Sequence, residues 1–211
     1  MADEIKLANP GPLGLIGFGL TTVMLSLINS GVLPQAGTAA VLPLAFAFGG
    51  LIQMVAGVME FRAGNTFGTV AFLSYGAFWW WFCLLIVLGS HGVLDLKGAG
   101  STIAVTLLAW GVFTLYMWVG TFRINRALWL VFLTLWVTFF LLGFGALLGA
   151  KELTVAGGWV GVACGLLAAY TSFATVTNTT FGRTVLPIGA PVVSPQRADA
   201  RVSARVPRRF A

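Results

Sequence analysis

The chain has 211 residues and few charges, because 12 Lys and Arg and 6 Asp and Glu make up only 9% of it, whereas a soluble globular domain carries about 25%. Apolar residues account for 58%, and there are 27 glycines besides. A soluble fold of this size could not bury so much apolar surface, so the composition excludes an ordinary cytosolic enzyme, a disordered chain and a secreted disulfide scaffold, and leaves a polytopic membrane protein.

The charged residues fall in narrow bands. The uncharged intervals between them are residues 7–59, 63–94, 98–122, 127–150 and 153–182. Because a helix needs about 20 apolar residues to cross a bilayer, the first interval holds two spans, with the break at residues 31–37. The predicted spans are 12–30, 40–60, 68–89, 102–122, 127–148 and 155–177. The sequence therefore predicts an all-α integral membrane protein, a bundle of six transmembrane helices.

The first predicted helix begins at the sequence Asn9-Pro10-Gly11-Pro12. Asparagine is a good N-cap and proline suits the first turn of a helix. A helix start presents free N–H groups and partial positive charge, which favour a bound anion. Taken alone, the motif is better explained by a plain helix cap. Farther along this helix, hydroxyl and amide side chains are spaced to form one polar stripe, which comprises Thr21, Thr22, Ser26 and Asn29.

The next three spans also carry polar side chains that hydrocarbon would not tolerate without a partner. Candidate pathway residues there are Gln53, Asn65, Thr66, Ser74, Tyr75 and Thr114. No Lys, Arg, Asp or Glu lies at the middle of any predicted span. Such a pathway suits a small neutral or weakly charged solute, and it does not suit a divalent metal ion.

Glu60 falls at the end of the second predicted span and is the one candidate for a proton-linked residue. Arg62 follows two positions later, and pairing with it would keep the carboxylate ionised. We therefore expect that Glu60 is not a mid-membrane proton carrier.

Small residues recur every fourth position on the last span, at Gly157, Gly161, Gly165 and Ala169. In a bilayer such a stripe lets two helix backbones approach closely. Three neighbouring tryptophans, Trp79, Trp80 and Trp81, are best explained by packing between helices.

Loop charges predict the orientation. With six spans, one side holds two cations, Lys97 and Lys151, and the other side holds ten, namely Lys6, Arg62, Arg123, Arg126, Arg183, Arg197, Arg201, Arg205, Arg208 and Arg209. Cytoplasmic loops carry the excess of Lys and Arg, so both termini are expected in the cytoplasm. Residues 1–189 would form the membrane domain, and residues 190–211 a disordered basic tail that either contacts anionic lipid or has no specific partner.

The chain contains two cysteines, Cys83 and Cys164, and one histidine, His91. Both thiols lie in apolar runs and are expected to be buried and inert. No metal, cofactor or catalytic residue is expected, because the spans hold no nucleophile–base pair and no set of metal ligands.

The opening motif, residues 9–19, resembles the signature of the acetate uptake transporters, the succinate–acetate permease family. Matches continue in the segments 48–61, 64–68, 71–79, 110–115 and 181–187, so the resemblance covers about residues 7–189. Gly11 stands where the family usually has alanine.

The resemblance implies a hexameric ring of six-helix protomers, each with its own pathway for acetate and often succinate, proton-coupled or channel-like. It also implies an apolar constriction at Phe18, Tyr75 and Leu135. Membrane lipid would be a partner and nucleic acid would not, and the location would be the inner membrane. The alternatives are a structural membrane protein without transport, or a channel for another small solute.

Overall fold

The computed structural model describes residues 7–193, and over this range the regular structure is helical throughout. The helices are α1 (Gly11–Asn29), α2 (Thr38–Leu44), α3 (Gln53–Arg62), α4 (Thr66–Ser90), α5 (Gly100–Thr121), α6 (Arg126–Leu148) and α7 (Lys151–Phe181), with a short 3-10 turn η1 (Gln35–Gly37) and the π-helical turns η2 (Ala45–Ile52). The elements η1, α2, η2 and α3 follow one another without a break and form one continuous helical segment, Gln35–Arg62. Counted this way, the described residues contain six helices that are long and apolar enough to cross a membrane, which confirms the predicted bundle.

The last helix is longer than the predicted span 155–177, since it runs for 31 residues from Lys151 to Phe181. Its first turn contains Lys151 and Glu152, which the prediction had assigned to a loop because of their charge. An acidic side chain in a first turn interacts favourably with the helix dipole, so these residues begin the helix at the edge of the apolar region.

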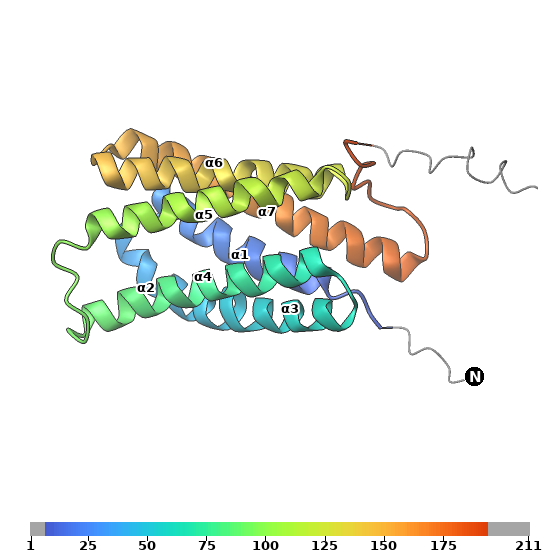
Figure 1. The fold of residues 1–211 in the computed structure, drawn as a ribbon, viewed down its shortest axis with the longest axis horizontal. Helices are drawn as coiled ribbons and strands as arrows, with labels where there is room; N and C mark the ends of the chain where they lie inside the picture. Colours follow the sequence, from blue (N-terminus) through green and yellow to red (C-terminus); the bar gives the residue numbers. More distant parts are fainter. Residues whose placement is uncertain (1–6, 194–211) are drawn as a thin grey trace, which may run out of the picture.

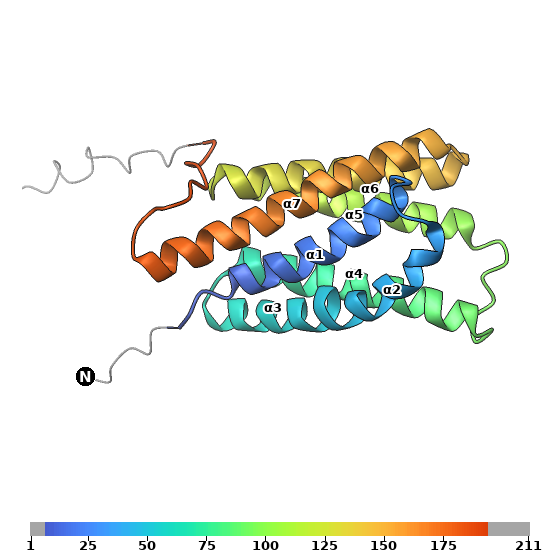
Figure 2. The ribbon, with the colours of Figure 1, turned by 180° about the vertical axis from the view of Figure 1, so that it is seen from behind.

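Figures 1 and 2 show the helices in two groups with α1 between them. Helices α5, α6 and α7 form one group and α3 and α4 the other, and α1 packs most extensively along α7. The backbones of α4 and α5 come close at few points, and large aromatic side chains fill the space between these two helices. The start of α1, the α3–α4 and α5–α6 connections and the end of α7 all lie at one end of the bundle (Figure 1), which we call the terminal end.

Glycines let α1 and α7 cross in backbone contact. A Cβ atom added to Gly19 would lie 2.8 Å from the carbonyl oxygen of Gly165, and one added to Gly165 would lie 2.7 Å from that of Gly19. One turn along α7, a Cβ on Gly161 would strike the side chain of Ser26. The predicted packing role of the small-residue stripe is confirmed. Gly161, Gly165 and Ala169 face α1 of the same chain, and Gly157 faces Leu141 and Leu142 of α6.

Two further glycines end helices in the left-handed region that other residues avoid. Gly64, with φ of 74°, lies between α3 and α4, and Gly149, with φ of 64°, ends α6. The chain can therefore reverse direction within a few residues at both places.

The segment after α7 folds back onto the bundle. The Asn178 side chain accepts the N–H groups of Val185 and Leu186, and the N–H of Val193 donates to the carbonyl of Phe122. The predicted disordered tail, 190–211, thus begins with residues that contact the α5–α6 connection, while residues 194–211 lie outside the described part of the chain.

The crossing of α1 and α7 yields a stability prediction. Gly165→Ala should lower the free energy of unfolding by about 1–3 kcal/mol, because the added methyl group meets backbone atoms that cannot move away. Gly100→Ala is the matched control, since a Cβ atom there meets nothing within 4 Å and helix propensity favours alanine. Thermal unfolding in detergent measures both. A melting temperature equal to that of the parent protein for Gly165→Ala would contradict the close crossing.

Candidate functional site

Two cavities follow one another through the bundle. The first, which we call the Gln53 cavity, has a volume of about 170 Å³ and reaches the terminal end, where Asn9 and Asn125 line it. The second, the Thr22 cavity, has a volume of about 380 Å³ and extends to residues near the opposite end, including Asn29 and Thr154. Phe18 and Leu135 line both cavities, so these two side chains lie at the boundary between them.

Of the three residues of the expected constriction, Phe18 and Leu135 line both cavities, and Tyr75 lines the Gln53 cavity beside Phe18. Phe18 comes from α1, Tyr75 from α4 and Leu135 from α6, and all three side chains are buried. The ring centroids of Phe18 and Tyr75 are 5.9 Å apart, and Phe132 packs against Tyr75 from α6 at 6.0 Å. We call Phe18, Tyr75 and Leu135 the waist. The sequence had not indicated Phe132, which adds a further aromatic ring beside it.

The hydroxyl of Tyr75 donates a hydrogen bond to another side chain of the protein. Thr114 donates its only hydroxyl proton to the carbonyl of Trp110 at 2.7 Å, so the 2.9 Å contact between Tyr75 and Thr114 is a hydrogen bond that Tyr75 donates. Thr114 is fully buried and lines neither cavity. Its role is to position Tyr75, which therefore offers its ring to the waist while its proton is bonded to α5.

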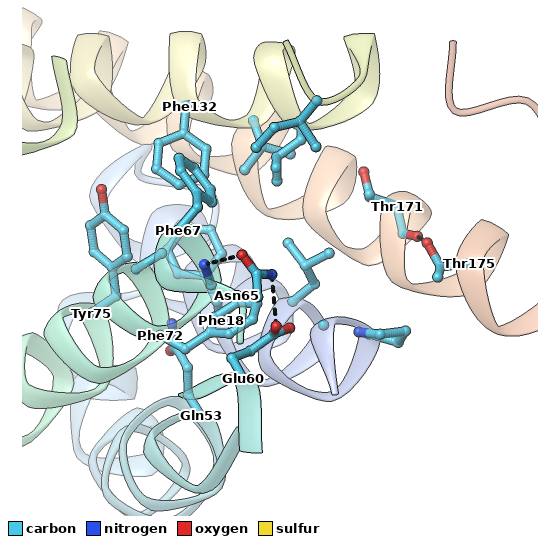
Figure 3. Close-up of a pocket in the computed structure, with 18 of the residues that line it drawn as sticks. Phe18, Gln53, Glu60, Asn65, Phe67, Phe72, Tyr75, Phe132, Thr171 and Thr175 are labelled. Atoms are coloured by element: carbon cyan, nitrogen blue, oxygen red, sulfur yellow. Dashed lines mark hydrogen bonds between the residues drawn. The ribbon is translucent and has the colours of Figure 1, made fainter. Parts of the chain in front are cut away.

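Gln53 is a buried amide without a hydrogen-bond partner. Its side chain is 1% exposed, it lines the Gln53 cavity, and neither its oxygen nor its nitrogen bonds to any described residue. Such a group costs about 1–3 kcal/mol when nothing compensates it. The amide of Gln53 therefore has free hydrogen-bonding groups at the wall of the cavity, where Figure 3 shows it among the lining side chains.

Thr22 likewise has a buried polar group without a hydrogen-bond partner among the described residues, and it lines the second cavity. Its hydroxyl is buried and lacks a partner in the described part of the chain, whereas the neighbouring Thr21 donates to the carbonyl of Gly17. Ser26 and Asn29 line the same cavity, so most of the polar stripe predicted on the first helix faces one space.

Three helix starts surround the Gln53 cavity, each with an asparagine. Asn9 accepts the N–H of Gly11 at 2.9 Å, Asn65 caps α4 by accepting that of Gly68 at 3.2 Å, and Asn125 caps α6 by accepting that of Leu128 at 2.8 Å. Asn125 was missed by the sequence reasoning, although an asparagine directly before a long apolar run is the same signal as at Asn65. All three helix dipoles favour negative charge at this end of the cavity.

Glu60 lies inside the Gln53 cavity and not in a pair with Arg62. Its side chain is only 3% exposed, and its Oε2 accepts a hydrogen bond of 2.7 Å from Nδ2 of Asn65, as Figure 3 shows. The expected partner Arg62 is exposed. The predicted pairing with Arg62 is wrong because Glu60 faces α1 and α4, while Arg62, two residues on, is turned by about 200° around the helix. That Glu60 is not a mid-membrane proton carrier stays a prediction.

Two of the other predicted pathway residues lie outside both cavities, and two residues that were not predicted line one of them. Ser74 lines a depression between α4 and α5 and neither cavity, because successive residues of a helix point about 100° apart and Tyr75 faces inward. Thr66 is exposed and lines neither cavity. Thr171 and Thr175 of α7 line the Gln53 cavity but were not foreseen, since threonine on a long helix commonly bonds to its own backbone, as both do here.

Cys83 and Cys164 are buried free thiols, as expected. Between residues 7 and 193, no three His, Cys, Asp or Glu side chains gather in a way that could hold a metal ion.

Comparison with known proteins gives consistent matches. The succinate-acetate/proton symporter SatP of Escherichia coli is 44% identical over 184 residues, which are 87% of this chain and 96% of that protein. Acetate permease A of Emericella nidulans is 35% identical over 197 residues, which are 87% of this chain and 66% of that protein. A solved structure described as the bacterial acetate channel SatP superposes with a TM-score of 0.84 at 43% identity, covering 87% of this chain and all of that one.

The family model described as GPR1/FUN34/yaaH matches residues 1–189, a range that contains both cavities and the waist. The chain belongs to the GPR1/FUN34/yaaH family.

Proposed function

We propose that this protein carries acetate, with succinate as a second substrate, across a membrane along a path inside each protomer. The observation that supports this most directly is that two cavities within the bundle share Phe18 and Leu135 as a common border. The path would run from the terminal end through the Gln53 cavity, the waist and the Thr22 cavity. The names of the three relatives given above all include acetate.

An apolar waist would select by dehydration. A ring of apolar side chains expels water from a narrow passage and so blocks ions that keep their hydration shells. Acetate is compact and half of it is a methyl group, which suits contact with the faces of Phe18 and Tyr75. Its carboxylate would be transferred between neutral groups on either side, the amide of Gln53 and the hydroxyl of Thr22.

These buried polar groups argue against a purely structural membrane protein. In such a protein, Gln53 and Thr22 would lower stability without a benefit, because each is buried and lacks a partner among the described residues. A channel for another small solute would use the same path, and substrate competition in the flux assay below separates that alternative.

We further propose that the protein lies in the inner membrane with both termini in the cytoplasm and assembles as a homo-hexameric ring surrounded by lipid. The ten-to-two asymmetry of loop cations supports the orientation. One relative is named a proton symporter and the solved structure a channel, and both modes are compatible with a single path through the waist. Catalysis has no place in this proposal.

The waist gives the test of transport. Phe18→Ala and Leu135→Ala should each raise the flux of labelled acetate into liposomes or admit larger carboxylates, because each widens the narrowest point. Both truncations remove core packing at a cost of about 2–5 kcal/mol, so flux must be compared per folded protein. Leu166→Ala is the control, since Leu166 lies on the exposed face of α7. Unchanged flux and unchanged size selection in well-folded samples of both variants would remove the waist from the path.

Gln53 gives a test of binding. Gln53→Leu should weaken acetate affinity by about tenfold to a hundredfold, which corresponds to the loss of one hydrogen bond to a charged group. Its melting temperature without acetate should stay equal or rise, because the amide has no partner to lose. Gln35→Leu is the matched control, since Gln35 bonds to the carbonyl of Ile28 at the opposite end of the bundle. A loss of stability with unchanged affinity would show that Gln53 is structural.

A further inference from the structure

The carboxylate of Glu60 sits between the first turns of two helices. A Cβ atom added to Gly68, in the first turn of α4, would lie 2.7 Å from Cδ of Glu60. A Cβ atom added to Gly11, the first residue of α1, would lie 3.3 Å from its Oε1. Glycine at position 68 therefore leaves the space that the carboxylate fills against the first turn of α4, whereas a methyl group at position 11 would only make a tight contact with it. The N–H groups of Gly11 and Gly68 donate to Asn9 and Asn65, and the side chain of Asn65 donates the hydrogen bond of 2.7 Å that holds the carboxylate. We call Gly11, Asn65 and Gly68 the cradle.

The cradle is electrostatically suited to a carboxylate. Helix starts carry partial positive charge and attract anions, and neither α1 nor α4 has an acidic residue in its own first turn. Neither helix carries any Lys, Arg, Asp or Glu. Glu60, reaching across from α3, is thus the anion that both helix starts face.

A second feature of the same cavity indicates a ligand beyond Glu60. Gln53 lies seven residues before Glu60 on one face of the same helix, about 10 Å deeper along the axis. Its amide is buried without a partner among the described residues, and both side chains line the Gln53 cavity. A carboxylate released from the cradle could therefore move inward to a free amide donor.

We propose that the cradle is a carboxylate-binding site, which Glu60 occupies in this structure and which the transported carboxylate takes by exchange with Glu60. This inference rests on the proposed function and adds a first binding site to the proposed path. Glu60 acts as a resident competitor, because each incoming carboxylate must displace it. Without that competitor, the apparent affinity for the transported carboxylate rises.

Chemical rescue tests the site directly. Glu60→Ala should lower the melting temperature, since the cradle then lacks its anion, and sodium acetate or formate should restore it with saturable dependence on concentration. Sodium chloride at equal ionic strength should not. Glu152→Ala is the matched control, because Glu152 is exposed in the first turn of α7 and lines neither cavity; acetate should stabilise it no more than the parent protein.

Glu60→Gln keeps a side chain of the same shape that can still accept from Asn65, so it covers the case in which Glu60→Ala fails to fold. Its apparent acetate affinity should be about tenfold tighter than that of the parent, which corresponds to one lost competing contact. Equal affinity in Glu60→Gln and the parent, together with no acetate-specific stabilisation of a folded Glu60→Ala, overturns the cradle. If the parent still moves labelled acetate in that case, the proposed function survives. If acetate rescues Glu60→Ala but no protein moves acetate, the cradle stands and the proposed path fails.

Discussion

Hydrocarbon offers no hydrogen bonds to a polar side chain, so a polar group inside a membrane bundle is stabilised by a partner in the protein or by a position on the wall of a cavity. The hydroxyls of the buried residues of α4 to α7 find partners in the protein, as in the bonds from Tyr75 to Thr114 and from Thr171 to its own helix. Gln53 and Thr22 do not, and both line cavities. Four tryptophan N–H groups also lack a partner in the described part of the chain: that of Trp79 belongs to a residue lining the Thr22 cavity, and those of Trp118, Trp129 and Trp136 belong to residues that line neither cavity. The two cavities, their apolar border and the glycine crossing that holds α1 against α7 can all be understood from this constraint.

The arrangement also explains how an anion could be accommodated without a cation. Three helix starts, at Asn9, Asn65 and Asn125, direct partial positive charge toward the terminal end of the Gln53 cavity. This charge is fixed by the backbone and cannot be titrated away. A lysine or arginine at the same place would bind a carboxylate more tightly and release it more slowly, whereas neutral donors allow both binding and release, which conduction requires.

Much of the fold followed from the sequence because charge marks the ends of membrane spans. The six spans were predicted correctly for that reason, whereas the stripe on α7 was predicted from the four-residue spacing of small side chains and the cap at Asn65 from an asparagine that precedes an apolar run. The side-chain directions were not, since a shift of one residue turns a position by about 100°. Ser74 therefore lies outside the bundle core while Tyr75 lies inside, and Glu60 bonds to Asn65 while Arg62 is exposed. The partner of the Tyr75 hydroxyl, 39 residues away on α5, depends on tertiary packing that no local pattern reveals.

The central claim is that carboxylates pass the waist, and a cysteine at Leu135 tests it most directly. Leu135→Cys should be modified by an anionic, water-soluble methanethiosulfonate reagent, and modification should block labelled-acetate flux, while acetate in excess should slow the reaction. The native thiols Cys83 and Cys164 are buried, and Val93→Cys in the exposed α4–α5 connection should react without loss of flux. Complete modification of Leu135→Cys, verified by mass, with acetate flux unchanged would contradict the account.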